Sequence, residues 1–144
     1  ALDCGKFEVE QHRIKTKYLA AANFALTQII SDTDTVARLA EFVGEAKQTI
    51  WTERPFYIVP GVYLFRSAGV MSAMRGNMGI KVAPQTLKQM QDCRTAKEQK
   101  EFGYKIAKEV ILEAKKQNFP AVYIIPPAKK PETIIPLLKE TELV

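Results

Sequence analysis

Three short apolar runs, each followed by a segment of helical periodicity, constrain the fold of this chain more than any other feature. The runs cover residues 23–30, 55–60 and 120–126 and are rich in β-branched and aromatic side chains. Short apolar runs that alternate with helices are typical of parallel strands that are buried on both faces. The chain is therefore predicted to have an α/β fold built from three parallel strand–helix units.

Three parallel strands are too few to close into a barrel, and a parallel sheet is normally covered on both of its faces. We therefore expect other protein to complete the sheet, either earlier sequence or a second chain. A length of 144 residues corresponds to one domain with a real core, and residues 1–144 are treated as a single domain. No charged-then-apolar leader precedes Ala1, so we expect no signal peptide.

Periodicity and helix-breaking residues place the remaining elements. Helices are expected over residues 7–22, from the turn at 31–34 to about residue 48, and over 66–75, 84–92, 95–117 and 132–143. The second strand is predicted to stop at Pro60-Gly61, because proline and glycine commonly end a strand.

The net charge of +5 and the pI of about 9.2 raise the question of an anionic partner. Basic and acidic residues interleave over 97–101 and 108–116, which is typical of a solvated helix face. Patterns of nucleic-acid-binding modules are absent, and no apolar run approaches the ~20 residues of a membrane span. We therefore expect no nucleic acid and no membrane, whereas an anionic cofactor or polyanionic small substrate suits this charge. Cys4 and Cys93 lack metal-ligand spacing. A single disulfide between them is one alternative, and two free thiols in a reducing cytoplasm are the simpler interpretation.

Ligands of parallel α/β proteins bind at the carboxyl ends of the strands, so residues at the ends of the runs are the first candidates. Gln28 follows Thr27 in the first run, and a buried Gln must satisfy both a donor and an acceptor. It either bonds neighbouring backbone or binds a ligand with paired donors and acceptors, such as a pterin ring. Lys129 and Lys130 place two cations at the same rim, where solvated lysines are the simpler interpretation. His12, the single histidine, is expected on a helix surface and not in a metal site.

A set of segments in a fixed order carries a family resemblance. The most specific part is the segment from Asn23 to Thr27-Gln28, which is followed by a strand with Pro60-Gly61 at its end. The other parts are segments 2–5, 31–34, 103–107 and 122–125. With this order and spacing, the chain resembles a methylenetetrahydrofolate reductase over about residues 3–140.

The resemblance implies that the chain is the carboxyl-terminal portion of a (β/α)8 TIM barrel, with its three strands corresponding to family strands six to eight. In that family the barrel binds FAD, and the reduced flavin passes a hydride to 5,10-methylenetetrahydrofolate to give 5-methyltetrahydrofolate. The resemblance therefore implies a cytoplasmic flavoprotein oxidoreductase of one-carbon metabolism. Its partners are a folate substrate and NAD(P)H or another electron donor.

The resemblance also implies roles for individual residues. The helix positions that contact FAD in the family are occupied here by Glu10, Arg13, Thr16 and Lys17. Among them, Lys17 suits a pyrophosphate partner best. Gln28 matches the family glutamine that contacts folate on the flavin side of the pocket. Lys130, or Lys129 beside it, lies near the position of a family arginine and is a candidate partner for folate carboxylates, although lysine lacks the bidentate fork of arginine.

The chain also departs from the family pattern. The family's catalytic Glu and an Asp near the flavin belong to strands that this chain lacks, so we expect no catalytic residue in it and no catalysis by these residues alone. Met74 takes the place of the aromatic that stacks on the substrate, and Val70 that of a neighbouring glutamine. A variant that uses another electron donor or a different pterin is therefore an alternative.

Two other functions are compatible with the residues. The first is a folate- or flavin-binding half barrel that pairs with another chain or with itself, because open-edged strands need such pairing. The second is a non-catalytic relative that serves as a subunit interface in a one-carbon complex. Oligomer formation, or pairing with the missing barrel half, is expected of the chain.

Overall fold

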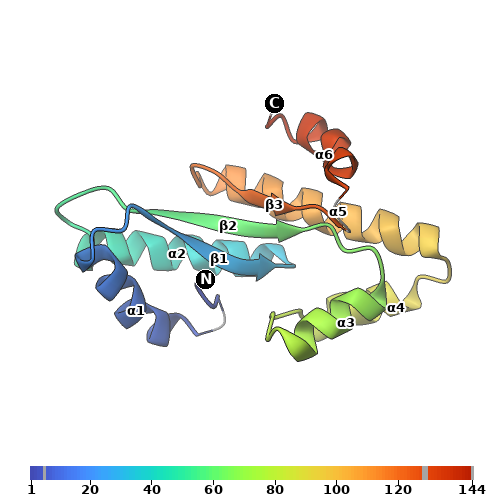
Figure 1. Ribbon diagram of the computed structural model, residues 1–144, viewed down its shortest axis with the longest axis horizontal. Helices are drawn as coiled ribbons and strands as arrows, with labels where there is room; N and C mark the ends of the chain where they lie inside the picture. The colour runs from blue at the N-terminus through green and yellow to red at the C-terminus, as the bar shows by residue number, and fades with distance from the viewer. Residues whose placement is uncertain (5, 128–129, 144) are drawn as a thin grey trace.

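The computed structural model of the chain describes residues 1–4, 6–127 and 130–143. It contains a parallel sheet whose strands lie in the order β1-β2-β3 (Figure 1). The strands are β1 (Phe24–Ile30), β2 (Tyr57–Tyr63) and β3 (Tyr123–Ile125). The prediction of an α/β fold with three parallel strands is confirmed.

Six α-helices connect and flank these strands in the described part of the chain. They are α1 (Phe7–Leu19), α2 (Thr33–Thr49), α3 (Ala68–Asn77), α4 (Pro84–Asp92), α5 (Ala96–Lys116) and α6 (Ile135–Glu140). The last predicted helix is divided, because a 3₁₀ turn over Pro131–Ile134 precedes α6 and Pro136 occupies the first turn of α6. None of the helices within the described ranges has the length and apolar content of a membrane span.

Side-chain caps explain where the two longest helices begin. Asp32 precedes α2, and its carboxylate accepts a hydrogen bond from the backbone nitrogen of Thr35 at 2.8 Å. At the start of α5, Glu98 N donates to Thr95 Oγ1 at 3.1 Å and Thr95 N donates to Glu98 Oε2 at 3.2 Å. Such caps satisfy backbone N–H groups that the first helical turn leaves without partners.

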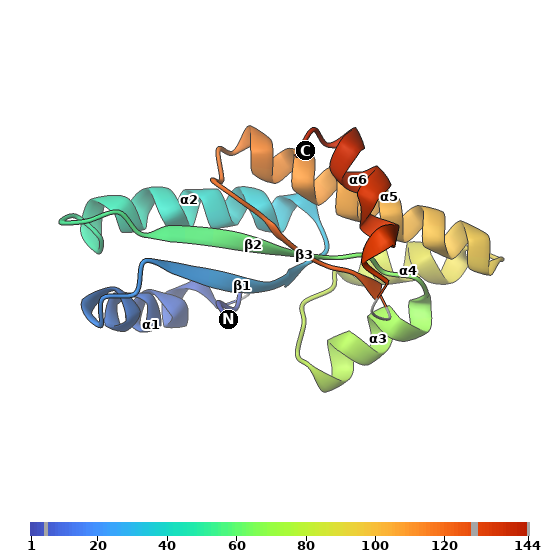
Figure 2. The same ribbon diagram turned by 45° about the horizontal axis from the view of Figure 1, so that its top comes forward.

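Helices α2 and α5 lie side by side on one face of the sheet (Figures 1 and 2). The buried core includes Ile58 and Val62 from alternate positions of β2, together with Leu39 of α2 and Val110 of α5. Alternate strand residues point to the same face, which is why every second residue of β2 packs against the helices. Helix α1 lies at the margin of this layer, beside β1 (Figure 2).

The opposite face of the sheet is not covered by a helix in the described part of the chain (Figure 1). Phe24 and Tyr57, which pair in register on β1 and β2, are 57% and 49% exposed. Leu26, two residues further along β1, is 39% exposed. A parallel sheet covered by helices on one side, with apolar side chains on the other, is consistent with a partial α/β barrel.

Strand β2 does not stop at Pro60-Gly61, so the predicted end of this strand is wrong. The strand continues because β1 is irregular at this point. Leu26 pairs with Val59, but the next pairing joins Ile29 to Gly61. Two residues of β1 therefore face the single Pro60, and the irregular step accommodates a residue that cannot donate a backbone hydrogen bond.

A fourth sheet position is occupied by the first residues of the chain. Leu2 forms a parallel bridge with Thr27 on the side of β1 away from β2. The backbone nitrogen of Leu2 donates to the carbonyl oxygen of Leu26 at 2.8 Å. The sequence gives no sign of this contact, because a single bridging residue leaves no period-two pattern.

Candidate functional site

Gln28 lies in the second half of β1, at the irregular step between β1 and β2. Its backbone is held on both sides. The N–H of Gln28 donates to the carbonyl oxygen of Leu2 at 2.8 Å, and its carbonyl oxygen accepts from Thr27 Oγ1 at 2.6 Å. The side chain is half-buried, and among the described residues its amide has no hydrogen-bond partner. The donor and acceptor of this amide are therefore available to a ligand.

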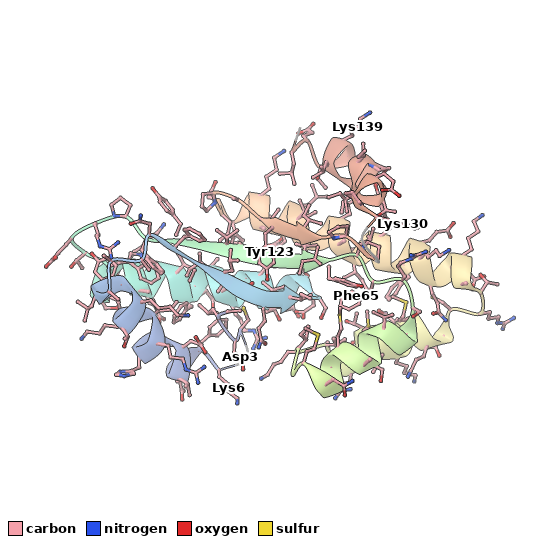
Figure 3. The ribbon with its side chains drawn as sticks, viewed as in Figure 1. Asp3, Lys6, Phe65, Tyr123, Lys130 and Lys139 are labelled. Carbon is pink, nitrogen blue, oxygen red and sulfur yellow. The ribbon has the colours of Figure 1, made fainter. Side chains whose placement is uncertain are left out.

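Lys130 follows β3 and lies toward the same end of the sheet as Phe65, which follows β2 (Figure 3). Its side chain is exposed. Lys129, the other member of the predicted pair, lies outside the described residues. The carboxyl ends of the strands therefore carry Gln28 on β1 and Lys130 after β3, with β2 between them.

A cleft of about 720 Å³ opens at the carboxyl end of β1. One wall is the turn after β1 with the first turns of α2, and the other is the end of α3 with the loop to α4. Its lining residues are Asp32, Asp34, Thr35, Arg38, Arg75 and 79–84. The Oγ of Ser31 donates to the carbonyl oxygen of Lys81 at 3.2 Å and fastens the loop to the end of β1.

Positive charge exceeds negative charge in this cleft. Arg38, Arg75 and Lys81 line it, against Asp32 and Asp34. The carboxylate of Asp32 is already occupied by the cap of α2. Neither arginine has a carboxylate partner in the part of the chain that the structure describes. The three cations come from three segments, so no sequence motif reveals the cluster, and only the packing of the α3–α4 loop against β1 assembles it.

Glu10 of α1 is fully buried, and Arg13 lies next to it on the helix surface. Arg13 Nη1 donates to Glu10 Oε1 at 2.8 Å. The second carboxylate oxygen, Oε2, has no hydrogen-bond partner within the described residues. A buried carboxylate oxygen without a partner is energetically costly. This position therefore has an unused acceptor.

Thr16 and Lys17, further along α1, differ in their surroundings. Thr16 is exposed, and its Oγ1 donates to the backbone carbonyl oxygen of His12. His12 itself is exposed on the helix surface, as the sequence predicts. Lys17 is half-buried and lines a cleft of about 330 Å³. The other lining residues are Ala1, Phe24, Ala25, Leu26 and Tyr123.

The structure does not bring Lys17 and Gln28 into one cleft. Helix α1 runs antiparallel to β1 (Figure 1). Lys17, near the end of α1, accordingly lines a cleft together with Phe24, the first residue of β1. Phe24 and Gln28 are four residues apart on the strand, roughly 13 Å. Any ligand that contacts both Lys17 and Gln28 has to extend along β1.

Cys4 and Cys93 are free, as predicted. Cys4 is buried, and burial, with a smaller effect of Asp3, raises the pKa of its thiol to about 12. A thiol with this pKa is neutral near pH 7 and is a poor nucleophile. Cys4 is therefore part of the core and not a reactive group.

Helix α3 carries Met74 and Val70, the two positions at which the chain is predicted to depart from the resembled family. Met74 is half-buried and packs against the core, and Val70 is partly exposed. Neither side chain offers the flat face on which a pterin ring stacks best.

A comparison with protein families gives one result. The family model described as methylenetetrahydrofolate reductase matches residues 3–132. This range includes the described site residues that the sequence predicts, from Glu10 to Lys130. No curated protein sequence matches the chain. The match confirms the resemblance seen in the order of the sequence segments.

Proposed function

Because the chain belongs to the methylenetetrahydrofolate reductase family, we propose that residues 1–144 form one domain, the carboxyl-terminal portion of a (β/α)8 barrel. In this proposal β1, β2 and β3 are family strands six to eight, and the exposed sheet face around Phe24 and Tyr57 is the interior of the barrel. The remaining strands of the barrel are supplied either by earlier sequence or by a second chain. The complete barrel converts 5,10-methylenetetrahydrofolate to 5-methyltetrahydrofolate in the cytoplasm.

The observation that carries this proposal is the free amide of Gln28 on a fixed backbone. A pterin ring presents adjacent hydrogen-bond donors and acceptors, and a side-chain amide pairs with both. Since the backbone of Gln28 is held by Leu2 and Thr27, little conformational freedom is lost when the amide binds a ligand. We therefore assign Gln28 to pterin binding.

The cations near the strand ends support a carboxylate-bearing substrate. Lys130 is assigned to the folate carboxylates, and the cleft with Arg38 and Arg75 adds positive charge at the end of β1. Arginine can bind a carboxylate through two parallel hydrogen bonds, which a lysine cannot do. The net charge of +5 favours the approach of the same kind of anion.

We assign the side chains of α1 to FAD binding, as membership of the family suggests. Lys17 provides a cation for the pyrophosphate beside the apolar surface of Phe24 and Leu26. Glu10 has an unused acceptor, Oε2, for a hydroxyl group, although the side chain is buried in this structure. Arg13 and Thr16 lie one turn apart on the same helix and complete the proposed contacts. When bound, the flavin supplies the hydride that reduces the methylene group to a methyl group.

The chain itself orients substrate and cofactor but does not supply the acid that protonates the pterin. We therefore expect the isolated chain to be inactive. Activity requires the missing strands, and the electron donor is NAD(P)H or another reductant.

The visible absorption spectrum of the purified protein after gel filtration tests this proposal. A bound flavin band, perturbed by added 5-methyltetrahydrofolate, is the expected result for the chain joined to the missing strands. The completed protein should also reduce methylenetetrahydrofolate when a reductant is supplied. A completed, flavin-loaded barrel without this activity would contradict the assignment.

A second function, a non-catalytic half barrel that pairs with another chain or with itself, is favoured by one observation. Phe24, Leu26 and Tyr57 form an exposed apolar surface on the sheet, and such surfaces are typical of protein contacts. Gel filtration coupled to light scattering separates the two functions. A colourless, stable oligomer that binds no folate supports the pairing function, and a stable monomer contradicts it.

A further inference from the structure

The irregular step in β1 depends on Thr27, which has three hydrogen bonds that a regular ladder does not contain. The backbone nitrogen of Gly61 donates to Thr27 Oγ1 at 2.9 Å, in place of a carbonyl oxygen. Thr27 Oγ1 in turn donates to the carbonyl oxygen of Gln28 at 2.6 Å. The carbonyl oxygen of Thr27 accepts from the hydroxyl of Tyr123 at 2.7 Å. These bonds join all three strands at one residue.

The contact between Tyr123 and Thr27 passes over β2. Tyr123 pairs in register with Gly61, and its ring lies over the middle of the sheet (Figure 3). A Cβ atom at Gly61 would lie 2.5 Å from the Tyr123 hydroxyl oxygen, so only glycine leaves room for this ring. The absence of a side chain at Gly61 therefore allows a residue of β3 to bond to β1.

The hydroxyl of Tyr123 remains a donor over the physiological pH range. Burial, with a smaller effect of Cys4, raises the pKa of Tyr123 above its usual value of 10. A neutral phenol donates to a carbonyl oxygen, whereas a phenolate cannot.

We propose that Tyr123 is a positioning residue for Gln28. Through the carbonyl oxygen of Thr27 it fixes the irregular step that sets the backbone of Gln28, and thereby the approach of the Gln28 amide to a pterin. The part concerning the ligand rests on the proposed function, and the part concerning the backbone does not.

Amide hydrogen exchange of the chain tests the backbone part without any ligand. Tyr123→Phe removes the hydroxyl and keeps the ring. We expect protection at the amides of Gln28 and Gly61 to fall roughly 3- to 10-fold, the loss of one net hydrogen bond, relative to protection at Val110 in α5. Tyr57→Phe is the matched control, since the half-exposed Tyr57 hydroxyl has no hydrogen bond within the described residues. Equal loss at Gln28, Gly61 and Val110 overturns the proposal, because it indicates only a general loss of stability.

Binding of 5-methyltetrahydrofolate tests the ligand part. Tyr123→Phe should raise the Kd roughly 3- to 10-fold in the wild-type background and leave it unchanged in the Gln28→Ala background. An equal effect in both backgrounds shows that Tyr123 does not act through Gln28 and overturns this part. If the wild-type chain, joined to the missing strands, binds no folate, the proposed function fails, while the exchange experiment still decides the role of Tyr123 at the backbone.

Discussion

Gly103 of α5 lies so close to Phe65 that a Cβ atom at Gly103 would overlap the carbonyl oxygen of Phe65. Phe65 is fully buried and follows the end of β2. The chain that leaves the sheet therefore rests directly on the backbone of α5. This close approach explains a glycine in the middle of a 21-residue helix, where glycine is otherwise unfavourable.

Gly103→Ala should destabilise the protein by about 3 kcal/mol or more, because a backbone carbonyl cannot move aside as a side chain can. Chemical denaturation measures the change in the free energy of unfolding. Gly44→Ala in α2 is the control, since a Cβ atom there has no neighbour within 4 Å. The control should raise stability by up to about 1 kcal/mol through helix propensity. If Gly103→Ala and Gly44→Ala have similar free energies of unfolding, the backbone at Phe65 can move away from α5 at little cost, which contradicts the prediction.

Gly61→Ala should destabilise the protein by about 1–3 kcal/mol, because the new methyl group displaces the Tyr123 ring and breaks its bond to Thr27. The test is denaturation of this variant in two backgrounds. In a Tyr123→Ala background the clash is absent, and most of the penalty should disappear. A penalty of the same size in both backgrounds means that Gly61 is required for the strand itself and not for the ring.

Glu140 should make the protein more stable at neutral pH than in acid. Hydrogen bonds from Lys108 at 2.7 Å and Tyr104 at 2.9 Å lower the pKa of this carboxyl below its usual value of 4.5. A lowered pKa stabilises the fold above the unfolded pKa, and this stabilisation is lost as the pH falls through the folded pKa. Stability curves of the wild type and Glu140→Gln should therefore converge as the pH decreases below about 4.5. Glu41→Gln removes an exposed carboxylate of α2 that has no ion pair in the described residues, and it is the matched control.

Lys17→Gln should raise the Kd for FAD roughly tenfold in the protein joined to its missing strands, through loss of one charge-assisted hydrogen bond. Lys15→Gln is the matched control, because Lys15 is exposed on the same helix and does not line the cleft beside Phe24. Flavin fluorescence during a titration with FAD gives the Kd of each variant. Equal affinities for the two variants would remove Lys17 from the proposed cofactor contacts.

Much of the fold could be predicted from local patterns. Helix α4 begins at the predicted Pro84 and ends at the predicted residue, because proline favours the first turn of a helix. Asp32 and Thr95 stand where helices α2 and α5 begin, since a short polar side chain satisfies the free N–H groups there. These signals depend on neighbours within a few residues, and a local pattern is sufficient to reveal them.

The family could also be predicted from the order of the segments, and with it the candidate residues Gln28 and Lys17. The contacts that these two residues make in the folded chain could not be predicted from the sequence. Whether the amide of Gln28 has a partner, and whether Lys17 lies near it, depends on how α1 and β1 pack together. Lys17 and Gln28 are near each other in the amino-acid sequence. In the folded chain they lie at different points along β1, because α1 and β1 run antiparallel.

The sequence by itself determined the presence and order of the strands and helices, and the family, because periodicity, caps and motif spacing act over short distances along the chain. Only the tertiary structure decided the irregular step at Thr27, which joins Gly61 and Tyr123, 34 and 96 residues further along. It also decided the continuation of β2 through Pro60, which the sequence predicts as an end. The physical reason is that a hydrogen bond between distant segments forms only after the chain has folded, and its geometry overrides the local preference of a single proline or glycine.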